Sequence, residues 1–334
     1  MTIREKEEAR ELRELSEFAS FSSKSLGRIR DEAPCDIRTC FMRDRDRIIH
    51  SKSFRRLKHK TQVFISPEGD HYRTRLTHTL EVSGIARTIA HALNLNESLC
   101  EAIAMGHDLG HTPFGHGGER ELSALSGGAF SHNKQSVRVA EKIERDGLGL
   151  NLTREVLDGI EHHSGEVSAK TLEGEIVALA DRIAYINHDI DDAVRAGFIS
   201  EEDIPKEYRD VLGKSHSKRI NTLVLDTIRE SEGKDKITMS AEVEKAMLGL
   251  RSFMFERVYR APFALHQEEK VRSMIARLFE YYSKDTDRLP EEYRPTVETE
   301  GVTVAVCDCI ACMTDRYALH TYNELFLPMS WNHI

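Results

Sequence analysis

The stretch Gly106-His-Asp-Leu-Gly-His-Thr-Pro-Phe-Gly-His116 decides how the fold is interpreted. It packs three histidines and one aspartate into eleven residues and contains no lysine or arginine. An isolated His-Asp pair is common by chance, but histidines at this density are poorly explained by packing alone. His107 and His111 share one face if the preceding helix continues. The glycines and Pro113 predict that this helix stops and that 110–118 forms a loop over a site.

Two flanking segments supply further metal-ligating side chains. His78 begins an apolar helical pattern in Arg75-Leu-Thr-His-Thr-Leu80, and Asp181 interrupts an apolar stripe in Ala178-Leu-Ala-Asp-Arg-Ile-Ala-Tyr185. A carboxylate on such a stripe is costly to bury unless it is paired or bound to a metal. Two imidazoles and two carboxylates suit Mn²⁺, Mg²⁺, Co²⁺, Ni²⁺, Fe²⁺ or Zn²⁺. The predicted ligands of a divalent metal ion are therefore His78, His107, Asp108 and Asp181.

The rest of the chain is dominated by helical periodicity. The pattern predicts helices over 5–18, 44–59, 77–93, 97–109, 135–146, 153–162, 172–195, 241–259, 265–282 and 302–320. Segment 284–301 holds two prolines and many acidic residues, which indicates a loop. The charged segment 200–235 has no pattern that favours one kind of element. Val63-Phe64-Ile65 precedes a turn-forming cluster, which predicts a short β-hairpin near 61–75. The predicted class is mainly α.

Composition indicates an ordinary soluble protein. Charged residues make up 31% and hydrophobic residues 40% of the 334 residues. No apolar run approaches the roughly 20 residues that a membrane helix needs, and the N-terminus lacks the apolar stretch of a signal peptide. We therefore expect a cytoplasmic protein that does not engage the membrane.

Charge is distributed unevenly along the chain. The net charge of −9 argues against a protein coated with nucleic acid over its whole surface. Segment 28–60 is nevertheless dense in arginine and lysine. A basic segment in an acidic protein suggests a local anionic ligand, although a solvated and self-neutralised helix face explains it as well.

Taken together, these motifs resemble a known family. Arg75-x-x-His78-Thr79, the stretch from His107 to His116, Asp181 followed by Tyr185, and Lys60-Thr-Gln-Val63 look like the HD-domain deoxynucleoside triphosphate triphosphohydrolases, the dGTPase-like group. The resemblance covers about 43–192 and returns over 307–316. It implies a helical HD-domain fold, a homo-oligomer, and cleavage of a deoxynucleoside triphosphate (dNTP) to deoxynucleoside and tripolyphosphate. In this mechanism metal-activated water attacks the α-phosphorus.

The same resemblance implies a division of the chain into three parts. Residues 1–60 would form an N-terminal helical, basic segment that packs on the core. Residues 61–200 would form the HD metal-dependent phosphohydrolase core. Residues 201–334 would form a C-terminal helical region with a role in oligomerisation or regulation.

Catalytic roles follow residue by residue from the resemblance. His116 becomes the general acid for the 5′-oxygen, with Glu119 as its carboxylate partner. His111 and His132 contact phosphates or assist proton transfer. The pattern leaves His162-His163 outside the motifs, as supporting or surface residues.

Substrate-binding roles rest on the same resemblance. They place Arg75 at the phosphates, Gln62 near the sugar, Tyr185 beneath the deoxyribose and Asp189 at the 3′-hydroxyl. By pattern alone, Tyr185 also fits a core residue and Asp189 a solvated face.

Two other functions compete with this interpretation. Another HD-type phosphohydrolase, such as a 5′-nucleotidase or phosphodiesterase, would use the same metal ligands, although Lys60-Thr-Gln-Val63 and the His116 motif weigh against it. A regulator that binds dNTP or single-stranded DNA without turnover would explain the basic segment, but every metal and acid position is filled. A second, allosteric dNTP is a further expected partner.

Overall fold

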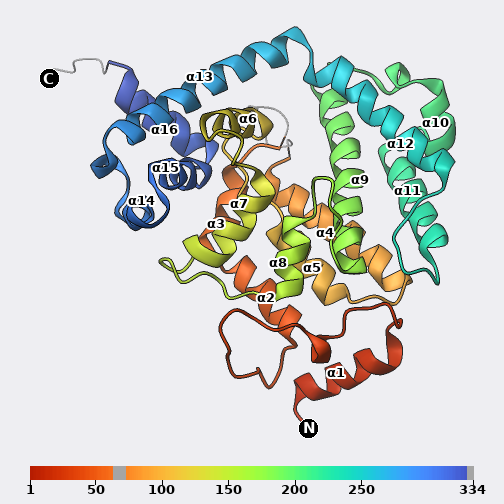
Figure 1. Ribbon diagram of the computed structural model, residues 1–334. Helices are drawn as coiled ribbons and strands as arrows, with labels where there is room; N and C mark the ends of the chain where they lie inside the picture. Colours follow the sequence, from red (N-terminus) through yellow and green to blue (C-terminus); the bar gives the residue numbers. More distant parts are fainter. Residues whose placement is uncertain (63–72, 329–334) are drawn as a thin grey trace, which may run out of the picture.

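A computed structural model describes residues 1–62 and 73–328 of the protein (Figure 1). Within these ranges lie sixteen α-helices and several short 3-10 and π-helical turns. The same ranges contain no strand longer than an isolated bridge, found at Arg28–Thr153 and Thr61–Thr74. The mainly α class is therefore confirmed.

The central helices are packed around the histidine-rich stretch. They are α2 (Cys40–Ile49), α3 (Lys52–Arg56), α4 (Arg75–Ala92), α5 (Glu97–Gly106), α6 (His116–Leu125), α7 (His132–Arg138), α8 (Arg154–Glu161) and α9 (Leu172–Arg195). Polar caps fix where the long ones begin. Thr74 and Thr77 form a reciprocal capping box at the start of α4, and the Thr171 hydroxyl accepts from the Gly174 amide at the start of α9.

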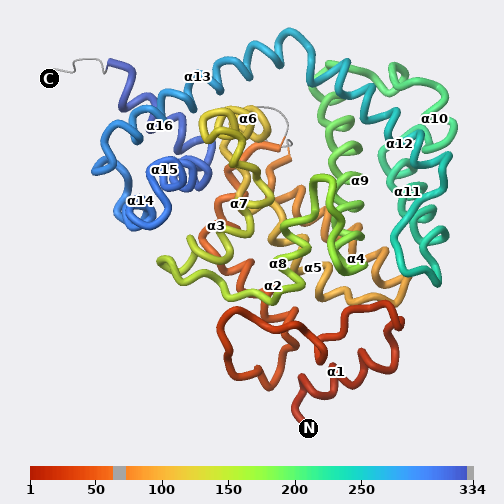
Figure 2. Tube along the Cα trace, viewed as in Figure 1, coloured from red at the N-terminus to blue at the C-terminus, as the bar shows by residue number. Residues whose placement is uncertain are grey.

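The remaining helices flank this centre. They are α1 (Ile3–Glu14), α10 (Lys206–Leu212), α11 (His216–Ser231), α12 (Ala241–Met254), α13 (Pro262–Lys284), α14 (Arg294–Glu300), α15 (Val302–Ala311) and α16 (Asp315–Phe326). Figure 2 shows α13 crossing from the α10–α12 group on one side to the α14–α16 group on the other. The C-terminal helices thereby return to the centre of the molecule.

Helix α9 lies between two buried apolar clusters. Ile176, Val177 and Ala180 belong to a large cluster with α4, α5, α8, α13 and α15. Ile183, Ile186 and Ile190 belong to a second cluster with α10, α11 and α12. Because α9 is covered on two faces, its polar side chains are forced into the interior, where they need partners. The three-part division of the chain stays a prediction, although the larger cluster draws residues from all three parts.

Several predicted elements were wrong or have different limits. The hairpin near 61–75 is not borne out: 63–72 lie outside the described residues, and the flanking Thr61 and Thr74 form only an isolated bridge. The predicted helix 44–59 is broken at Ser51, whose hydroxyl caps α3. The predicted helix 302–320 is broken because Thr314 caps α16. The expected loop 284–301 contains α14, in which Pro295 occupies the first turn, where proline is tolerated.

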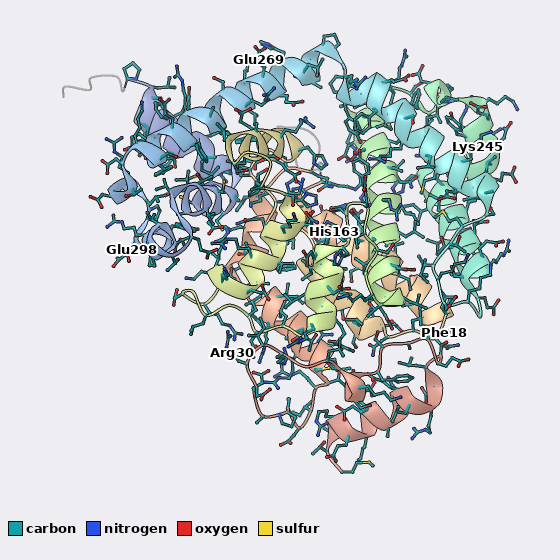
Figure 3. All side chains as sticks on the ribbon, in the orientation of Figure 1. Phe18, Arg30, His163, Lys245, Glu269 and Glu298 are labelled. Atoms are coloured by element: carbon teal, nitrogen blue, oxygen red, sulfur yellow. The ribbon has the colours of Figure 1, made fainter. Side chains whose placement is uncertain are left out.

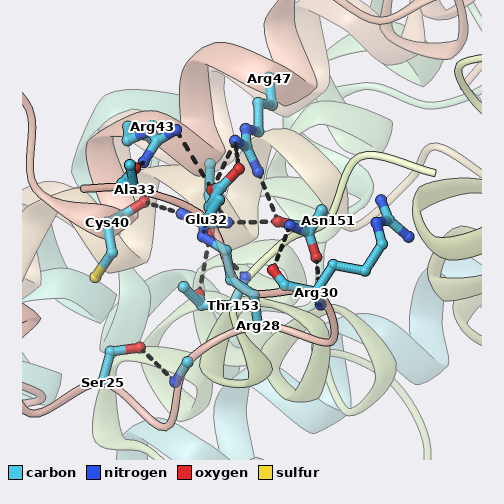
Figure 4. A network of polar contacts seen from close by, with 12 residues as sticks. Ser25, Arg28, Arg30, Glu32, Ala33, Cys40, Arg43, Arg47, Asn151 and Thr153 are labelled. Carbon is cyan, nitrogen blue, oxygen red and sulfur yellow. Dashed lines mark hydrogen bonds and ion pairs between the residues drawn. The ribbon is translucent and has the colours of Figure 1, made fainter. Parts of the chain in front are cut away.

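The basic segment is tied down by carboxylates rather than free (Figure 4). Glu32 accepts from Arg28 at 2.9 Å and from Arg47 at 2.6 Å, with Arg43 at 3.4 Å. Arg28 also pairs with Asp44, which is fully buried and accepts the Thr153 amide at 2.8 Å. These contacts fasten the N-terminal segment to the loop that precedes α8, and they satisfy charges that would otherwise attract an anion.

Within the described residues, no helix is long and apolar enough to cross a membrane. The six cysteines are all free. Cys307, Cys309 and Cys312 are buried on or beside α15, as expected for small apolar residues.

Candidate active site

Three helices supply the proposed metal ligands. His78 lies one turn into α4, His107 and Asp108 directly follow α5, and Asp181 lies in the middle of α9. His78, His107 and Asp108 are buried, and Asp181 is partly exposed. Because α4, α5 and α9 pack against one another, residues more than seventy positions apart in sequence meet at one point.

The ligand atoms are spaced as they would be around one ion. His78 Nε2 lies 2.9 Å from Asp181 Oδ1. His107 Nε2 lies 3.5 Å from Asp108 Oδ2 and 3.8 Å from Asp181 Oδ1. Two ligands at right angles, each about 2.1 Å from a metal, are roughly 3 Å apart. His78, His107 and Asp108 also form a group whose ligand atoms all lie within 4.8 Å of one another.

The tautomer of His107 fits a metal ligand. Its Nδ1 lies 2.6 Å from the Ala104 carbonyl, to which it donates. Nε2 therefore carries the lone pair, and it is buried with no hydrogen-bond partner. Metal-bound histidines commonly donate their second nitrogen to a carbonyl in this way. An unpartnered buried lone pair is costly, and a cation would satisfy it.

Both carboxylates of the ligand set are ionised. Burial acts to raise the pKa of Asp108, but the Arg75 guanidinium holds that pKa well below its usual range. Burial also opposes ionisation of Asp181, yet the hydrogen bond with His78 and the nearby His107 lower its pKa below the ordinary value. Two negative charges next to two imidazoles match the chemistry of a divalent ion.

One side of the site is lined by Arg75 and by histidines. Arg75 is buried, and its Nη1 lies 2.7 Å from Asp108 Oδ2. His111 lies on the same side, where burial and the neighbouring Arg75 lower its pKa well below the ordinary value, so it is neutral. Asp108, His111 and His132 also have ligand atoms within 4.8 Å of one another. Since Arg75 already neutralises Asp108, this side suits an anion better than a second cation.

His132 is held between a carboxylate and a second histidine. Its Nδ1 lies 2.7 Å from Glu119 Oε1, and its Nε2 lies 3.2 Å from His163 Nε2. His163 donates from Nδ1 to the Ile160 carbonyl at 2.7 Å, so its Nε2 can only accept. His132 can donate to both partners only as an imidazolium, and the Ser164 hydroxyl also lies 3.4 Å from its Nε2. Burial opposes that charge, but Glu119 outweighs it and raises the pKa of His132.

His163 is the clearest site residue that the sequence did not reveal. Figure 3 places it near the middle of the molecule, beside the end of α8. It is buried, and its ring centroid lies 5.0 Å from that of His107 and 5.1 Å from that of His132. Burial lowers its pKa to about 4. Nothing in the local pattern distinguishes it from its neighbour His162, which is only half-buried.

His116 and Glu119 lie together at the start of α6. His116 Nδ1 is 3.1 Å from Glu119 Oε2, and the His116 side chain is 56% exposed, so it can reach a bound molecule. The pKa of Glu119 is lowered far below its usual range: burial opposes ionisation, but the hydrogen bonds with His116 and His132 outweigh it. Glu119 thus orients two histidines at once.

A pair of tyrosines follows the metal ligands along α9. Asp181, Tyr185 and Asp189 are spaced by four residues and so lie along one face of the helix. The Tyr185 ring stacks on Tyr259, with centroids 6.1 Å apart and planes 16° apart. The Tyr259 hydroxyl donates to Asp189, whose pKa burial raises to about 8. Tyr259 lies in the π-helical turn after α12, and the sequence pattern gave no reason to select it.

Gln62 lies at the edge of this arrangement. Its Oε1 is buried with no hydrogen-bond partner. Its backbone carbonyl lies close to Gly115, where a Cβ would be 3.4 Å from that oxygen and 3.3 Å from Arg75 Nη2. The segment with Gln62 therefore lies against the loop that leads to His116.

Comparison with known proteins agrees with this geometry. Residues 75–186 match the HD domain, and residues 237–324 match a phosphohydrolase-associated domain. The first match contains all four proposed metal ligands. The class is therefore that of HD-type phosphohydrolases.

The relatives narrow the class to one family. A deoxyguanosinetriphosphate triphosphohydrolase-like protein of Caldanaerobacter subterraneus is 58% identical over 308 residues, covering 92% of this chain and 91% of the relative. Proteins of the same name from Clostridium perfringens and Desulfatibacillum aliphaticivorans are 54% and 51% identical, covering 91% and 98% of this chain and 92% and 99% of the relatives. The chain belongs to the deoxyguanosinetriphosphate triphosphohydrolase-like family.

Proposed function

We propose that this phosphohydrolase cleaves dNTP to deoxynucleoside and tripolyphosphate. The observation that supports it best is the pairing of two charge environments in one site. The carboxylate and imidazole ligands of His78, His107, Asp108 and Asp181 suit a divalent ion. Beside them, Arg75 and the His132 imidazolium supply fixed positive charge for a polyphosphate.

The proposed steps use side chains already in position. His78, His107, Asp108 and Asp181 would hold a divalent ion, which would supply activated water at neutral pH. Arg75 and His132 face the triphosphate oxygens and neutralise charge. His116, held by Glu119, gives its proton to the departing 5′-oxygen when the bond to the α-phosphorus breaks.

The tyrosine pair supports a deoxyribose over a ribose. Tyr185 and Tyr259 form a stacked wall beside Asp189, along α9 from the metal ligands. The Asp189 Oδ1 atom is buried without a hydrogen-bond partner, so it is available to a sugar hydroxyl. The resemblance implies that Tyr185 stacks beneath the deoxyribose and excludes a 2′-hydroxyl.

Product analysis tests the proposal. The four dNTPs are supplied singly and in pairs with Mn²⁺ or Mg²⁺, and products are separated by chromatography. Tripolyphosphate from a dNTP supports the proposal, whereas phosphate from a deoxynucleoside monophosphate would assign a 5′-nucleotidase instead. Tight dNTP binding with no turnover under any pairing would point to a regulator.

Other expectations from the sequence stay predictions. They are a homo-oligomer, a cytoplasmic location, activation by a second dNTP, and binding of single-stranded DNA. The paired dNTP reactions test activation directly, since an allosteric dNTP would stimulate hydrolysis of a different one.

A further inference from the structure

The loop that carries His111 and His116 has little support of its own. It joins the end of α5 to the start of α6, and two successive residues, Phe114 and Gly115, have positive φ values of 61° and 60°. That conformation is unfavourable for phenylalanine and persists only where the surroundings impose it. Within the loop, the Thr112 hydroxyl donates to the Gly115 carbonyl at 2.8 Å. Other contacts must therefore fix the geometry.

Asp315, from the far end of the chain, supplies one of these contacts. Its Oδ1 accepts the Phe114 amide at 2.9 Å, at the strained position itself. Its Oδ2 accepts both the amide and the hydroxyl of Thr61, at 3.0 Å and 2.6 Å. One buried carboxylate therefore joins the His116 loop to the segment that carries Gln62.

Lys60 supplies the second contact. Its ammonium group is fully buried and donates to the carbonyls of His111 and of Ala311, the latter at 2.7 Å. Its own carbonyl accepts the Arg75 amide at 3.0 Å. Lys60 thus links the loop, the start of α4 and the last turn of α15.

A third contact from the same C-terminal helices holds α7, the helix that begins at His132. Asp308 on α15 accepts from Gln135 at 2.8 Å and from Arg138 Nε at 2.7 Å, and both donors lie on α7. The two elements that carry the proton-transferring histidines are therefore both held by α15–α16. The proposed metal ligands, by contrast, come from α4 and α9 and from the turn that follows α5.

We infer that Asp315 and Lys60 are positioning residues for the His111–His116 loop, so that the C-terminal helices α15 and α16 set the catalytic geometry without touching the substrate. The inference rests on the proposed function for its catalytic consequence, but the positioning itself can be measured without turnover. A displacement of about 1 Å in a proton donor is enough to cost up to about a hundredfold in rate.

The test compares Asp315→Ala and Asp315→Asn with Glu324→Ala and Glu324→Gln. Glu324 lies on the same helix and is 61% exposed, so its variants match the chemical changes without touching the loop. Hydrogen exchange, metal content and the kcat of dNTP hydrolysis are measured on the full chain. We expect faster exchange in 111–118, unchanged exchange in α9, unchanged metal content, and a kcat lowered at least about tenfold in Asp315→Ala. Asp315→Asn keeps one hydrogen-bond acceptor, so its kcat should fall less than that of Asp315→Ala.

The outcomes separate the two proposals. If the unaltered protein does not release tripolyphosphate, the proposed function fails, and the exchange pattern alone decides the positioning role. Uniformly faster exchange across 111–118 and α9 in both Asp315 variants would show a general loss of stability and overturn the inference. Unchanged exchange in the loop would overturn it as well. If Asp315→Ala does not fold, the same measurements on Asp315→Asn and Lys60→Met are compared with those on the Glu324 variants.

Discussion

Single side chains in this site take their chemistry from one or two contacts. The Ala104 carbonyl fixes the His107 tautomer and leaves Nε2 free for a cation, whereas Glu119 favours the charged form of His132. The two histidines have the same intrinsic chemistry. We propose that their partners make His107 a metal ligand and His132 a phosphate-facing charge.

At this scale, Asp181→Asn is expected to separate metal binding from folding. The amide keeps the shape of the carboxylate but removes the only negative charge that α9 places beside His78. We expect metal affinity to fall by more than about a hundredfold. Mutation of a residue that only hydrogen-bonds to a metal ligand already lowers metal affinity by about 10–100-fold. Metal content after dialysis measures it, with Asp191→Asn on the same helix as the control. Equal metal content in the two variants would contradict the ligand assignment.

His116→Ala should lower catalysis and leave metal binding unchanged. His116 is not within the proposed ligand set, so metal content should be unchanged. Loss of a general acid typically lowers kcat by about 10²–10⁴-fold. Rapid-quench turnover with metal analysis of the same sample measures both quantities. A variant with unchanged kcat would remove His116 from the proposed mechanism.

Lys60 makes folding stability depend on pH. Burial lowers its pKa from 10.5 to about 7 in the folded chain. Between these values the unfolded chain binds more protons, so stability should rise with pH, by up to about 1.4 kcal/mol per pH unit. Below pH 7 the contribution is constant, because both states are protonated. Urea unfolding at pH 7 and pH 9 measures the free energy of unfolding of the natural chain and of Lys60→Met. The same change between the two pH values in both proteins would contradict the prediction.

At the scale of elements, the site depends on how closely the turn after α5 approaches α7. The Gly110 amide donates to the Ser136 hydroxyl at 2.9 Å, and that hydroxyl donates to the His107 carbonyl at 2.7 Å. Such an approach requires glycine, because an added Cβ would lie 2.2 Å from the Ser136 nitrogen. The turn and α7 carry His107, His111 and His132, so their spacing sets the site.

Gly110→Ala should therefore disrupt both folding and the site. The obstructing atoms belong to the α7 backbone, which cannot rotate away, and overpacking of this kind costs about 1–3 kcal/mol or more. Urea unfolding and metal content measure the two effects. Gly84→Ala on α4 is the matched control, because nothing lies within 4 Å of its added Cβ. That change should be neutral or stabilising by up to about 1 kcal/mol. Equal stability of the two variants would show that the turn can move.

At the scale of the whole molecule, charge pairing decides which surfaces can attract anions. The basic segment 28–60 is bound to carboxylates of its own neighbourhood, and Glu32 alone faces Arg28, Arg43 and Arg47 (Figure 4). Arg75 and His132 are also paired, with Asp108 and Glu119, but these pairs lie beside the proposed metal ligands. We therefore expect an anion to bind at the interior site together with a divalent ion, rather than at the N-terminal surface.

Single-stranded DNA should accordingly bind weakly. At physiological salt we expect no saturable binding of a labelled oligonucleotide, because Arg28, Arg43 and Arg47 of the basic segment are already paired with Glu32. Glu32→Gln should increase binding at low salt by releasing Arg43 and Arg47 from their carboxylate partner, whereas Asp31→Asn, on an exposed neighbour, should increase it less. Fluorescence anisotropy across a salt series measures this. Tight binding by the natural chain would instead favour the regulator hypothesis.

The sequence by itself determined the mainly α class and predicted the metal ligands. Asp181 interrupts an apolar helical pattern, where a carboxylate is costly without a partner, and His107–Asp108 lies in a stretch unusually dense in histidine. His78 begins an apolar helix, and the resemblance to a known family joins it to the other ligands. Their roles, like those of His116 and Glu119, stay predictions until they are measured. The breaks at Ser51 and Thr314 were missed because a hydroxyl cap outweighs an apolar period.

Only the tertiary structure decided which other residues join the site. His163, Tyr259, Lys60 and Asp315 act through partners far away in sequence: Asp315 meets Phe114 across 201 positions, and Lys60 meets Ala311 across 251. No local pattern encodes such a contact, because it depends on how α13 brings the C-terminal helices back to the centre. Burial then lowers the pKa values of Lys60 and His163 and raises that of Tyr259, and burial is a property of the packed molecule rather than of a short stretch of sequence.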